Sequence, residues 1–383
     1  MKKPDEFEQF RDRLSKVDLE IVDLISERQQ IVTKIGRIKR AEGREIRDFR
    51  REKVVMESAL EHAREIGLES KLVEDIVRTL IQYSLVNQEK KLISDAGRGG
   101  GKTVLLIGGA GRMGQWFAAM LSAQGFAIDL ADTTLKSGPG RFSDWRDAGV
   151  DYDIIVVATP ITTSNQILTD LAKLRPTGLI FDIASLKAPL RKGIQALARA
   201  GCKVASLHPM FGPETELLSR RHLIFVDAGC PEATLEAKEL FSGTLAEQLN
   251  MTIENHDRLI AYVLGLSHAL NVTFFDALQR CGEGATELIK MSSTTFDEQL
   301  LVSAAVARGN PWLYFDIQHL NEFGNEALNA MCESADHIRE LVAAGDAQGF
   351  VGLMERGQDY FALRRRPDEQ AQEQGNRRRK ISD

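Results

Sequence analysis

The stretch TVLLIGGAGRMGQWFAAML, residues 103–121, constrains the fold more than any other part of this chain. It places the pattern G-x-G-x-x-G, at Gly109, Gly111 and Gly114, between a short apolar run and the start of a helical one. Glycines permit a tight turn there, and the free N–H groups that begin the helix can bind a pyrophosphate. The stretch therefore predicts the strand, loop and helix of a dinucleotide-binding domain.

An acidic residue indicates which dinucleotide is bound. The next apolar run ends at Asp132, 21 residues after Gly111. A carboxylate there accepts hydrogen bonds from ribose hydroxyls and would repel a 2′-phosphate, so we expect NAD rather than NADP. We also expect Met113 and Thr159 to lie at the cofactor, whereas Arg112 faces either its phosphates or solvent.

Six apolar, β-rich runs alternate with helical stretches between residues 102 and 228; they are TVLLIGG, AIDLAD, DIIVVATP, GLIFDIAS, CKVASLHP and HLIFVDAG. Continuous apolar runs separated by helices indicate a buried parallel sheet. Helical spacing before them predicts a long helix to about residue 41, a break near Gly43, and helices near 49–66 and 69–90.

The chain is therefore expected to be a multidomain protein. Its expected parts are an all-α domain (1–90), a polar, glycine-rich linker (91–102), a Rossmann-type α/β domain (103–230), an all-α domain (231–365) and a disordered tail (366–383).

The first helix carries three cations. Arg28 and Lys39 are 11 positions apart, which places them within about 20° of each other around the helix and roughly 16 Å apart along it. Their long side chains could hold a small dianion together. Arg11 precedes Arg28 by 17 residues, about 25 Å along a straight helix. It can join that site only from a second subunit; alternatively, all three cations are solvated.

Several runs here resemble the all-helical AroQ class of chorismate mutase over about residues 5–90: RDRLSKVD, SER, KIGRIK, RDFRRE and SLVNQ. That family is an intertwined dimer, so the resemblance implies a homodimer in which Arg11 is donated to the partner's site. It implies eight site residues: Arg11 and Arg28 bind the two carboxylates and Arg51 orders them, Lys39 and Gln88 bind the ether oxygen with Glu52 beside Gln88, Asp48 meets the C4 substituent, and Ser84 completes the pocket. The rearrangement of chorismate moves no proton, and Lys39 would stabilise the charge that develops on the ether oxygen.

A second set of runs, from residue 103 to about 363, is similar to the prephenate dehydrogenase family in its bifunctional T-protein form: VLLIGGAGRMG, VATPI, DIASLK, LHPMFGP, LSHAL and NPWLYFDI. The resemblance implies that the C-terminal all-α domain serves dimerisation and substrate binding. In that family the histidine of HPMFGP takes the proton of the C4 substituent while hydride leaves C4 for the nicotinamide. Loss of carbon dioxide then makes the ring aromatic.

The same resemblance implies that His208 is this base, that Ser185 orients His208 and the substituent, and that His268 lies near the substrate. An imidazole is suited to accepting a proton near neutral pH. Without the resemblance, His208 could also be a packed core residue.

One position departs from the family. Relatives carry an arginine that binds a substrate carboxylate on the helix before the N-P turn, and a gapless count back from Asn310 places Ala305 there. Arg308, about one helical turn further on, could replace it. Three functions stay open: the standard reactions of chorismate and prephenate in tyrosine biosynthesis, the same reactions on 4-amino-4-deoxy substrates to give 4-aminophenylpyruvate, or a regulatory protein with an inactive dehydrogenase half.

The bulk properties argue against other functions. The net charge of -6 gives no general attraction for nucleic acid, and no apolar run approaches the ~20 residues that span a bilayer. The N-terminal MKKPDEFEQF has no apolar core, so it is not a signal peptide. The four cysteines have no C-x-x-C spacing, which favours buried free thiols over a metal site. We therefore expect a cytoplasmic enzyme that binds neither membranes nor a metal.

Overall fold

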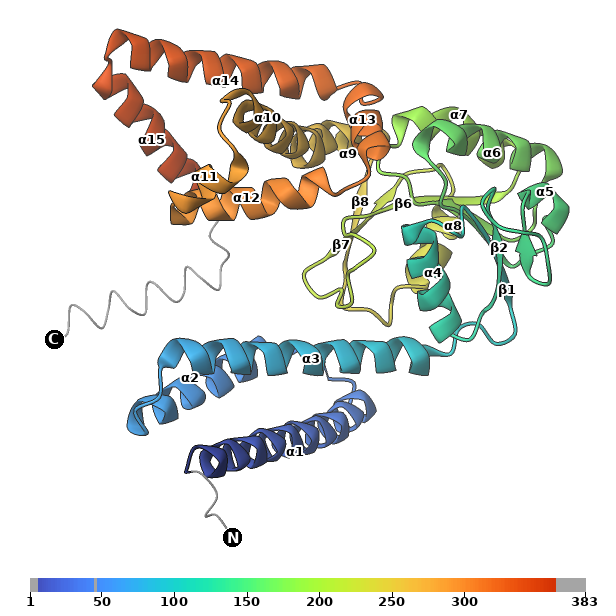
Figure 1. Cartoon of the computed structure of the whole chain (residues 1–383). Coiled ribbons are helices and arrows are strands. Elements are labelled where there is room, and N and C mark those ends of the chain that lie inside the picture. The colour runs from blue at the N-terminus through green and yellow to red at the C-terminus, as the bar shows by residue number, and fades with distance from the viewer. Residues whose placement is uncertain (1–5, 45–46, 363–383) are drawn as a thin grey trace. The chain divides into compact units, whose positions relative to one another are not determined.

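The computed structural model describes residues 6–44 and 47–362. It divides into two compact units, residues 1–256 and 257–383 (Figure 1). The first unit contains the N-terminal helices and a sheet, and the described part of the second unit is helical. The tail that we expect to be disordered, 366–383, lies outside the described residues.

The N-terminal part of the first unit forms the three helices that the apolar spacing predicts: α1 (Glu6–Ala41), α2 (Phe49–Glu65) and α3 (Ser70–Ala96). The break between the first two includes Gly43, whose φ of +65° favours glycine. Asp48 then caps α2 by accepting a hydrogen bond from the Arg51 N–H at 2.9 Å. Both α1 and α2 pack against α3.

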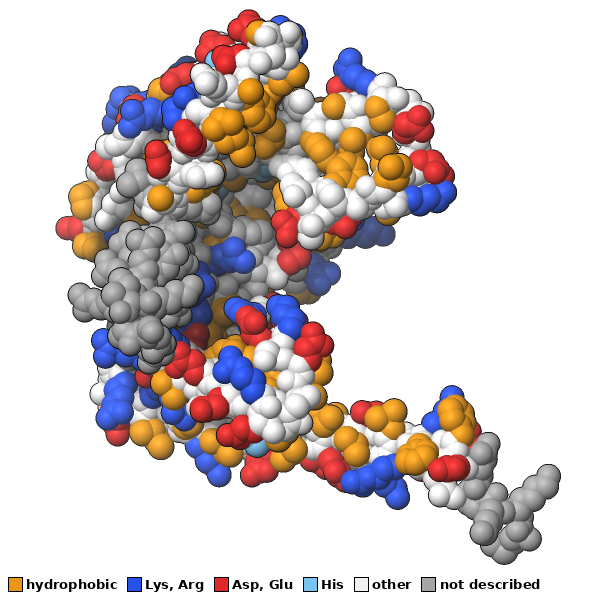
Figure 2. Space-filling model, turned by 90° about the vertical axis from the view of Figure 1, so that its left-hand side faces the viewer, with side chains coloured by type: hydrophobic (Ala, Val, Ile, Leu, Met, Phe, Trp, Pro, Cys, Tyr) orange, Lys and Arg blue, Asp and Glu red, His pale blue; other side chains and the backbone are white. Residues whose placement is uncertain are grey.

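Helix α1 keeps an apolar face exposed within one chain. Phe10, Leu14, Leu24 and Ile31 are 67%, 61%, 64% and 49% exposed, and apolar side chains are visible along this helix in Figure 2. An amphipathic helix of a globular protein normally buries such a stripe. Within a single chain, no other described segment covers this apolar face.

The linker predicted at 91–102 is wrong over its first half, because α3 continues to Ala96. The helix extends because Glu89 is buried, and its carboxylate accepts the backbone N–H groups of Leu218 and Leu245 at 2.7 and 2.6 Å. Tertiary contact with the sheet domain therefore overrides the polar composition of this stretch.

An eight-stranded sheet forms the centre of the first unit, in the order β3-β2-β1-β4-β5-β6-β7-β8. All six predicted runs form strands (Figure 1). Five of them are largely buried beneath helices, whereas most of β2 is only partly buried. The strands are β1 (Thr103–Ile107), β2 (Ala127–Ala131), β3 (Arg141–Phe142), β4 (Ile154–Val157), β5 (Leu179–Asp182), β6 (Lys203–Pro209), β7 (His222–Val226) and β8 (Glu247–Met251).

Aromatic residues from strands and helices fill the core of this domain. Phe117, Phe181, Phe225 and Phe241 are all buried in one cluster. The helical elements between the strands are α4 (Arg112–Ala123), α5 (Trp145–Ala148), α6 (Ile161–Leu174), η1 (Ala188–Leu190), α7 (Arg191–Arg199) and α8 (Pro231–Glu239).

Three features of the sheet differ from the prediction. Strand β3 has only two residues, and β8 is an edge strand whose sequence, EQLNM, lacks a continuous apolar run because most of its side chains are exposed. The sheet thus extends to Met251, so the expected domain end at residue 230 is wrong. Strand β7 pairs antiparallel with β6, because a loop without a crossover helix joins them.

The second unit confirms the stop predicted near residues 309–311. Asn310 caps α13 by accepting hydrogen bonds from the Trp312 and Leu313 N–H groups. The elements are α9 (Ile253–Ile260), within which the two units divide, the π-helical η2 (Ala261–Leu266), α10 (Ser267–Arg280), α11 (Ala285–Lys290), α12 (Thr294–Ala307), α13 (Pro311–His319), α14 (Gly324–Ala344) and α15 (Ala347–Ala362).

All four cysteines are free, but the expectation that they are buried is wrong for two of them. Cys202 is buried and Cys230 is partly buried, whereas Cys281 and Cys332 are exposed. The exposed pair lie where the helical unit faces solvent, after the end of α10 and on the surface of α14.

One helical stretch among the described residues, Ile253–Arg280, is long and apolar enough by length and composition to cross a membrane, although we expected no such run. Core helices of soluble proteins satisfy the same criteria, so a single stretch is weak evidence for a membrane protein.

Candidate active sites

The predicted mutase residues lie on all three N-terminal helices. Two of these residues, Arg28 and Ser84, are in direct contact. Arg28 of α1 donates hydrogen bonds from Nη1 to Ser84 Oγ at 2.7 Å and to the Leu80 carbonyl at 3.1 Å, both on α3. Ser84 is buried, and partial burial lowers the pKa of the Arg28 guanidinium. Because α3 accepts both bonds, the orientation of this cation is fixed.

Gln88 lies one turn beyond Ser84, where α1 and α3 approach each other. A Cβ on Gly36 of α1 would lie 3.4 Å from Cγ of Gln88, so the glycine makes room for this amide. Gln88 Oε1 is buried and has no hydrogen-bond partner in the described part of the chain. An unpaired buried carbonyl oxygen is costly, and a hydrogen-bond donor of a ligand would satisfy it. Lys39 lies three residues after Gly36 and is half-buried.

The other predicted mutase residues begin α2. Asp48 and Arg51 are joined through the cap of this helix, and both side chains are exposed. Glu52 forms a two-pronged ion pair with Arg47 at 3.0 and 3.1 Å. Arg47 also donates to Ser219 Oγ in the sheet domain, and the sequence analysis did not identify it.

Arg11 does not join these residues within one chain. It is exposed on α1, pairs with Glu8 at 3.3 Å and lies over the Phe7 ring. Since α1 is one continuous helix, the 17 residues between Arg11 and Arg28 span about 25 Å. This agrees with the prediction that Arg11 cannot reach the site of Arg28 on the same helix.

The glycine loop is packed too closely to accept side chains. A Cβ on Gly114 would lie 2.4 Å from the Gly108 carbonyl oxygen, and one on Gly109 would lie 2.9 Å from the Leu106 carbonyl oxygen. Gly108 has a φ of +85°, and a Cβ added to it would lie 2.5 Å from the Ala158 carbonyl oxygen. The requirement for glycine thus extends one residue before the predicted pattern.

Helix α4 begins directly after this loop. Gly111 is its N-cap, and no side-chain hydrogen bond caps it in the described structure, so its first N–H groups can bind an anion. Arg112 forms an exposed ion pair with Glu214. Met113 is partly buried against the core, and Thr159 Oγ1 lies 2.9 Å from Ser164 Oγ after β4.

Asp132 lies against the loop. It follows β2, its Oδ2 accepts the Ala110 N–H at 3.2 Å, and its Oδ1 accepts bonds from the Thr134 N–H and Oγ1 at 3.0 and 2.8 Å. This places a carboxylate beside the first helical turn, as ribose recognition requires.

His208 lies near the end of β6 and is 3% exposed. Its Nδ1 is 2.9 Å from Nε2 of His256, a fully buried residue on α9. Burial, then the charges of His256 and Lys187, holds the pKa of His208 well below its usual value of 6.5. Ser185, which we expect to orient His208, is partly buried.

A buried ion pair supports the strand that carries His208. Lys187 Nζ lies 2.6 Å from Asp182 Oδ1 and donates to the Leu207 carbonyl at 2.7 Å. Both charged residues are at most 1% exposed. Lys187 thus fixes the backbone immediately before His208.

His268 lines a cavity of about 450 Å³ in the second unit. Its ring lies 4.1 Å, centroid to centroid, from that of Tyr314. His268 Nδ1 and Gln318 Oε1 are buried without hydrogen-bond partners among the described residues, and burial lowers the pKa of His268. The cavity is otherwise mostly apolar and offers two unpaired polar atoms to a ligand.

Both candidate positions for the missing arginine, Ala305 and Arg308, are exposed. Ala305 lies in the last turn of α12 and does not line this cavity. Arg308 follows the end of α12, between Ala307 and Gly309, which both line it.

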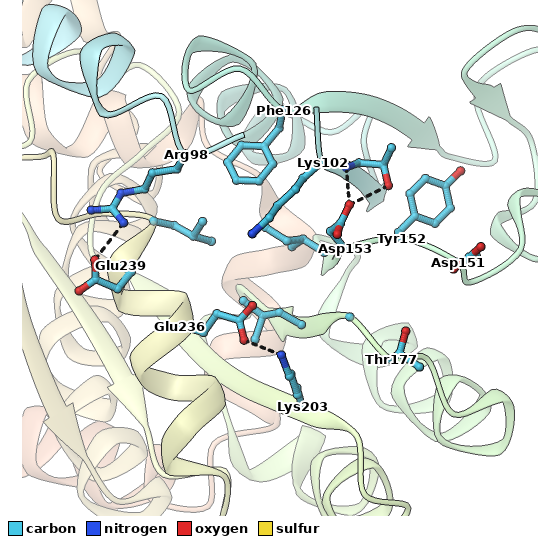
Figure 3. A pocket seen from close by; sticks show the side chains of 15 residues that line it. Arg98, Lys102, Phe126, Asp151, Tyr152, Asp153, Thr177, Lys203, Glu236 and Glu239 are labelled. Carbon is cyan, nitrogen blue, oxygen red and sulfur yellow. Dashed lines mark hydrogen bonds and ion pairs between the residues drawn. The ribbon is translucent and has the colours of Figure 1, made fainter. Parts of the chain in front are cut away.

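A larger cavity, of about 590 Å³, lies at the opposite edge of the sheet, where β1, β4, β5 and β6 begin (Figure 3). Ion pairs between Arg98 and Glu239 at 2.9 Å and between Lys203 and Glu236 at 3.1 Å occupy much of its wall. No predicted site residue lines it. The glycine loop, Asp132 and His208 instead follow or end strands at their carboxyl edge, where α/β sheets bind ligands.

Comparison with protein families gives three matches along the chain. Residues 10–89 match "Chorismate mutase type II", 137–242 match "Prephenate dehydrogenase, nucleotide-binding domain", and 252–356 match "Prephenate dehydrogenase, dimerization domain". The chain is a chorismate mutase joined to a prephenate dehydrogenase. The second match begins after the glycine loop, so the role of that loop rests on its own geometry.

Relatives of this bifunctional chain include two called T-protein. The one from Enterobacter agglomerans is 25% identical over 363 residues, 92% of each chain. The one from Haemophilus influenzae is 25% identical over 369 residues, 92% of this chain and 91% of the relative. A "4-amino-4-deoxyprephenate dehydrogenase" from Streptomyces pristinaespiralis is 27% identical over 264 residues, 65% of this chain and 88% of the relative.

Solved structures support the fold of the dehydrogenase. That of prephenate dehydrogenase from A. aeolicus, in complex with hydroxyphenyl propionate and NAD+, has a TM-score of 0.57 at 18% identity and covers 69% of this chain and 98% of its own. That of Synechocystis arogenate dehydrogenase has a TM-score of 0.52 at 16% identity, covering 69% and 100%.

Three residues of the dehydrogenase were not identified from the sequence: Gly108, Lys187 and His256. The first adjoins the glycine pattern, and the second ends the DIASLK run, where a lysine after an apolar strand was a usable signal. His256 gave no signal, because its partner is 48 residues away in the sequence.

Proposed function

We propose that this chain catalyses two successive reactions of tyrosine biosynthesis. The mutase domain rearranges chorismate to prephenate, and the dehydrogenase domains convert prephenate to 4-hydroxyphenylpyruvate and carbon dioxide with reduction of NAD. The observation that carries this proposal is the order of the three family matches in one chain, with T-protein relatives aligned over 92% of it.

In the mutase, Arg28 binds one carboxylate of chorismate, held in place by Ser84. Lys39 and the Nε2–H2 group of Gln88 donate hydrogen bonds to the ether oxygen, where charge develops as the C–O bond breaks. Asp48 meets the C4 hydroxyl, and Arg51 and Glu52 order the pocket at the start of α2. The residues orient the substrate, so no proton transfer is needed.

The mutase works as a homodimer in which Arg11 completes the partner's site. The uncovered apolar face of α1 and the match to a dimerization domain support an assembly of two chains. The distance of about 25 Å along α1 between Arg11 and Arg28 excludes a shared site within one chain.

In the dehydrogenase, the loop of Gly109, Gly111 and Gly114 holds the pyrophosphate of NAD at the start of α4. The close packing of these glycines and the position of Asp132 fit a dinucleotide with free ribose hydroxyls. Arg112, Met113 and Thr159 flank it. NAD, when bound, accepts the hydride from C4 of prephenate.

His208 accepts the proton of the C4 hydroxyl at Nε2 as the hydride leaves. The C–CO2 bonding electrons then enter the ring as carbon dioxide departs, and the C4 oxygen regains a proton to give 4-hydroxyphenylpyruvate. Its low pKa keeps the imidazole neutral and able to act as a base at neutral pH. Ser185 lies near the substituent, and His268 and Arg308 bind the substrate from the helical domain.

The standard reactions of chorismate and prephenate account for the chain better than the two alternative functions do. Full-length T-protein relatives account for both halves, whereas the 4-amino relative aligns with 65% of the chain. A regulatory protein with an inactive dehydrogenase half is disfavoured because the glycine loop, Asp132 and His208 are all in place. The relatives are biosynthetic enzymes, which supports a cytoplasmic location.

The test uses the purified full-length chain. Chorismate alone should be consumed, and prephenate with NAD should give NADH, with prephenate preferred over 4-amino-4-deoxyprephenate. His208→Asn should reduce NADH formation by about 10³-fold and leave chorismate consumption unchanged. If prephenate gives no NADH, or His208→Asn retains full activity, the proposal is wrong.

A further inference from the structure

The buried partner of His208 lies on α9, and no role follows for it from the sequence. Nδ1 of His208 and Nε2 of His256 are 2.9 Å apart, with the rings 5.1 Å apart between centroids at an angle of 67°. The two side chains are 3% and 0% exposed. At this distance one nitrogen donates a proton and the other accepts it, because two lone pairs would repel.

We propose that His256 is a positioning residue for prephenate oxidation: its Nε2 accepts the Nδ1–H of His208. This inference rests on the proposed role of His208 as the base. An imidazole carries one proton on two nitrogens when neutral. With that proton held on Nδ1, the lone pair is on Nε2, where it can take the proton of the C4 hydroxyl. The opposite arrangement would put the proton on Nε2 and leave His208 unable to act as the base.

The choice of a histidine as the partner has a consequence for the pH range of the enzyme. A carboxylate in this place would stabilise the protonated form of His208 and raise its pKa. His256 brings no negative charge, so it orients His208 without that effect. The nearby cation Lys187 also disfavours protonation of His208. Lys187 is itself paired with Asp182, whose Oδ1 lies 2.6 Å from its Nζ. The pair therefore keeps the base oriented and neutral together.

Backbone contacts hold both rings in place. His208 is paired in register with Ile224 of β7, and Lys187 holds the preceding Leu207 carbonyl at 2.7 Å. The His256 N–H donates to the Thr252 carbonyl at 3.0 Å, which fixes the start of α9. Neither ring depends on a mobile surface side chain for its position.

Three variants of the full-length enzyme separate positioning from packing. His256→Gln keeps an acceptor near the Nε2 position, His256→Leu fills the space without one, and His256→Glu supplies a charged acceptor. We expect kcat for NADH formation to stay within about threefold for Gln and to fall about 10²-fold for Leu, with KM for prephenate and NAD little changed. Chorismate consumption by the same preparations should be unchanged and reports correct folding.

The pH profile is the measurement that packing alone would not alter. For His256→Glu, the acid limb of kcat/KM should move to higher pH by about one unit, because the carboxylate favours protonated His208. An unmoved limb, or equal kcat for His256→Leu and wild type, would overturn the proposal. If His256→Leu fails to fold, the Gln and Glu profiles decide. Retained activity in His208→Asn would instead refute the base assignment, independently of His256.

Discussion

We propose that Arg308 takes the place of the substrate-binding arginine expected at the position of Ala305. It is exposed, and its neighbours Ala307 and Gly309 line the cavity that holds His268. A charge-assisted bond to a carboxylate is worth about 1.5–3 kcal/mol. We therefore expect Arg308→Ala to raise KM for prephenate by roughly 10- to 100-fold, with kcat little changed in steady-state assays.

The matched control is Ala305→Arg, one turn earlier on α12. Because Ala305 does not line the cavity, this change should leave prephenate turnover within about twofold. If it improves prephenate turnover and harms the 4-amino analogue while Arg308→Ala is neutral, the binding arginine belongs at 305 and the 4-amino substrate regains support.

The pKa of His208 predicts the pH dependence of the dehydrogenase. Burial, His256 and Lys187 all disfavour the imidazolium, so the neutral base persists below pH 6.5. We expect kcat/KM for prephenate to stay on its plateau at pH 6.5 and to decline only at lower pH. An acid limb centred above the usual pKa of 6.5 would contradict this electrostatic account.

The same shift affects stability. In the unfolded chain His208 regains a pKa of about 6.5, so below that pH the unfolded state binds more protons than the folded one. The free energy of unfolding should therefore fall as pH decreases through 6.5, which urea titrations at several pH values measure.

At the scale of elements, α3 is the structural link between the two activities. It carries Ser84 and Gln88 in the mutase, and its next residue, Glu89, accepts two backbone N–H groups of the sheet domain. Burial raises the pKa of Glu89, an effect that these two bonds oppose. The segment it contacts at Leu218 follows His208 by ten residues.

Glu89→Gln should destabilise this junction. The amide offers one acceptor oxygen for two N–H groups, and its NH2 would face the other donor. We expect a loss of about 1–3 kcal/mol in the free energy of unfolding, measured by urea denaturation. The control is Lys90→Gln, since its 3.8 Å ion pair with Glu216 is exposed and worth about 0–1 kcal/mol. Equal losses in both variants would show that Glu89 contributes nothing special.

At the scale of the whole molecule, we propose that the mutase site is complete only in a dimer. Arg11→Ala and Arg28→Ala should each abolish chorismate consumption and spare prephenate oxidation. When the two variant chains are co-expressed, mixed dimers contain one intact site, so about a quarter of wild-type mutase activity should return under random pairing.

Arg13 provides the matched control for this experiment. It lies on the same helix, exposed and paired with Glu20 at 3.5 Å, and Arg13→Ala should keep full mutase activity. If co-expression restores nothing, Arg11 does not act across an interface.

Much of the fold and part of the site could be predicted from local sequence. The six apolar runs became strands, the glycine pattern became a strand–loop–helix, and Asp132 lies beside it, because each feature depends on residues close together in the chain. Spacing on the first helix likewise indicated Arg28, whereas Ser84 and Gln88 are implied by the family resemblance alone.

Tertiary structure alone decided the rest. It paired His208 with His256, extended α3 into the first half of the predicted linker, where Glu89 is buried, and added β8 at the edge of the sheet. These features depend on contacts between residues far apart in the chain, where burial and hydrogen bonding outweigh local propensity. The sequence by itself determined which chemistry the chain carries, and the packing of distant segments decided how its base is held.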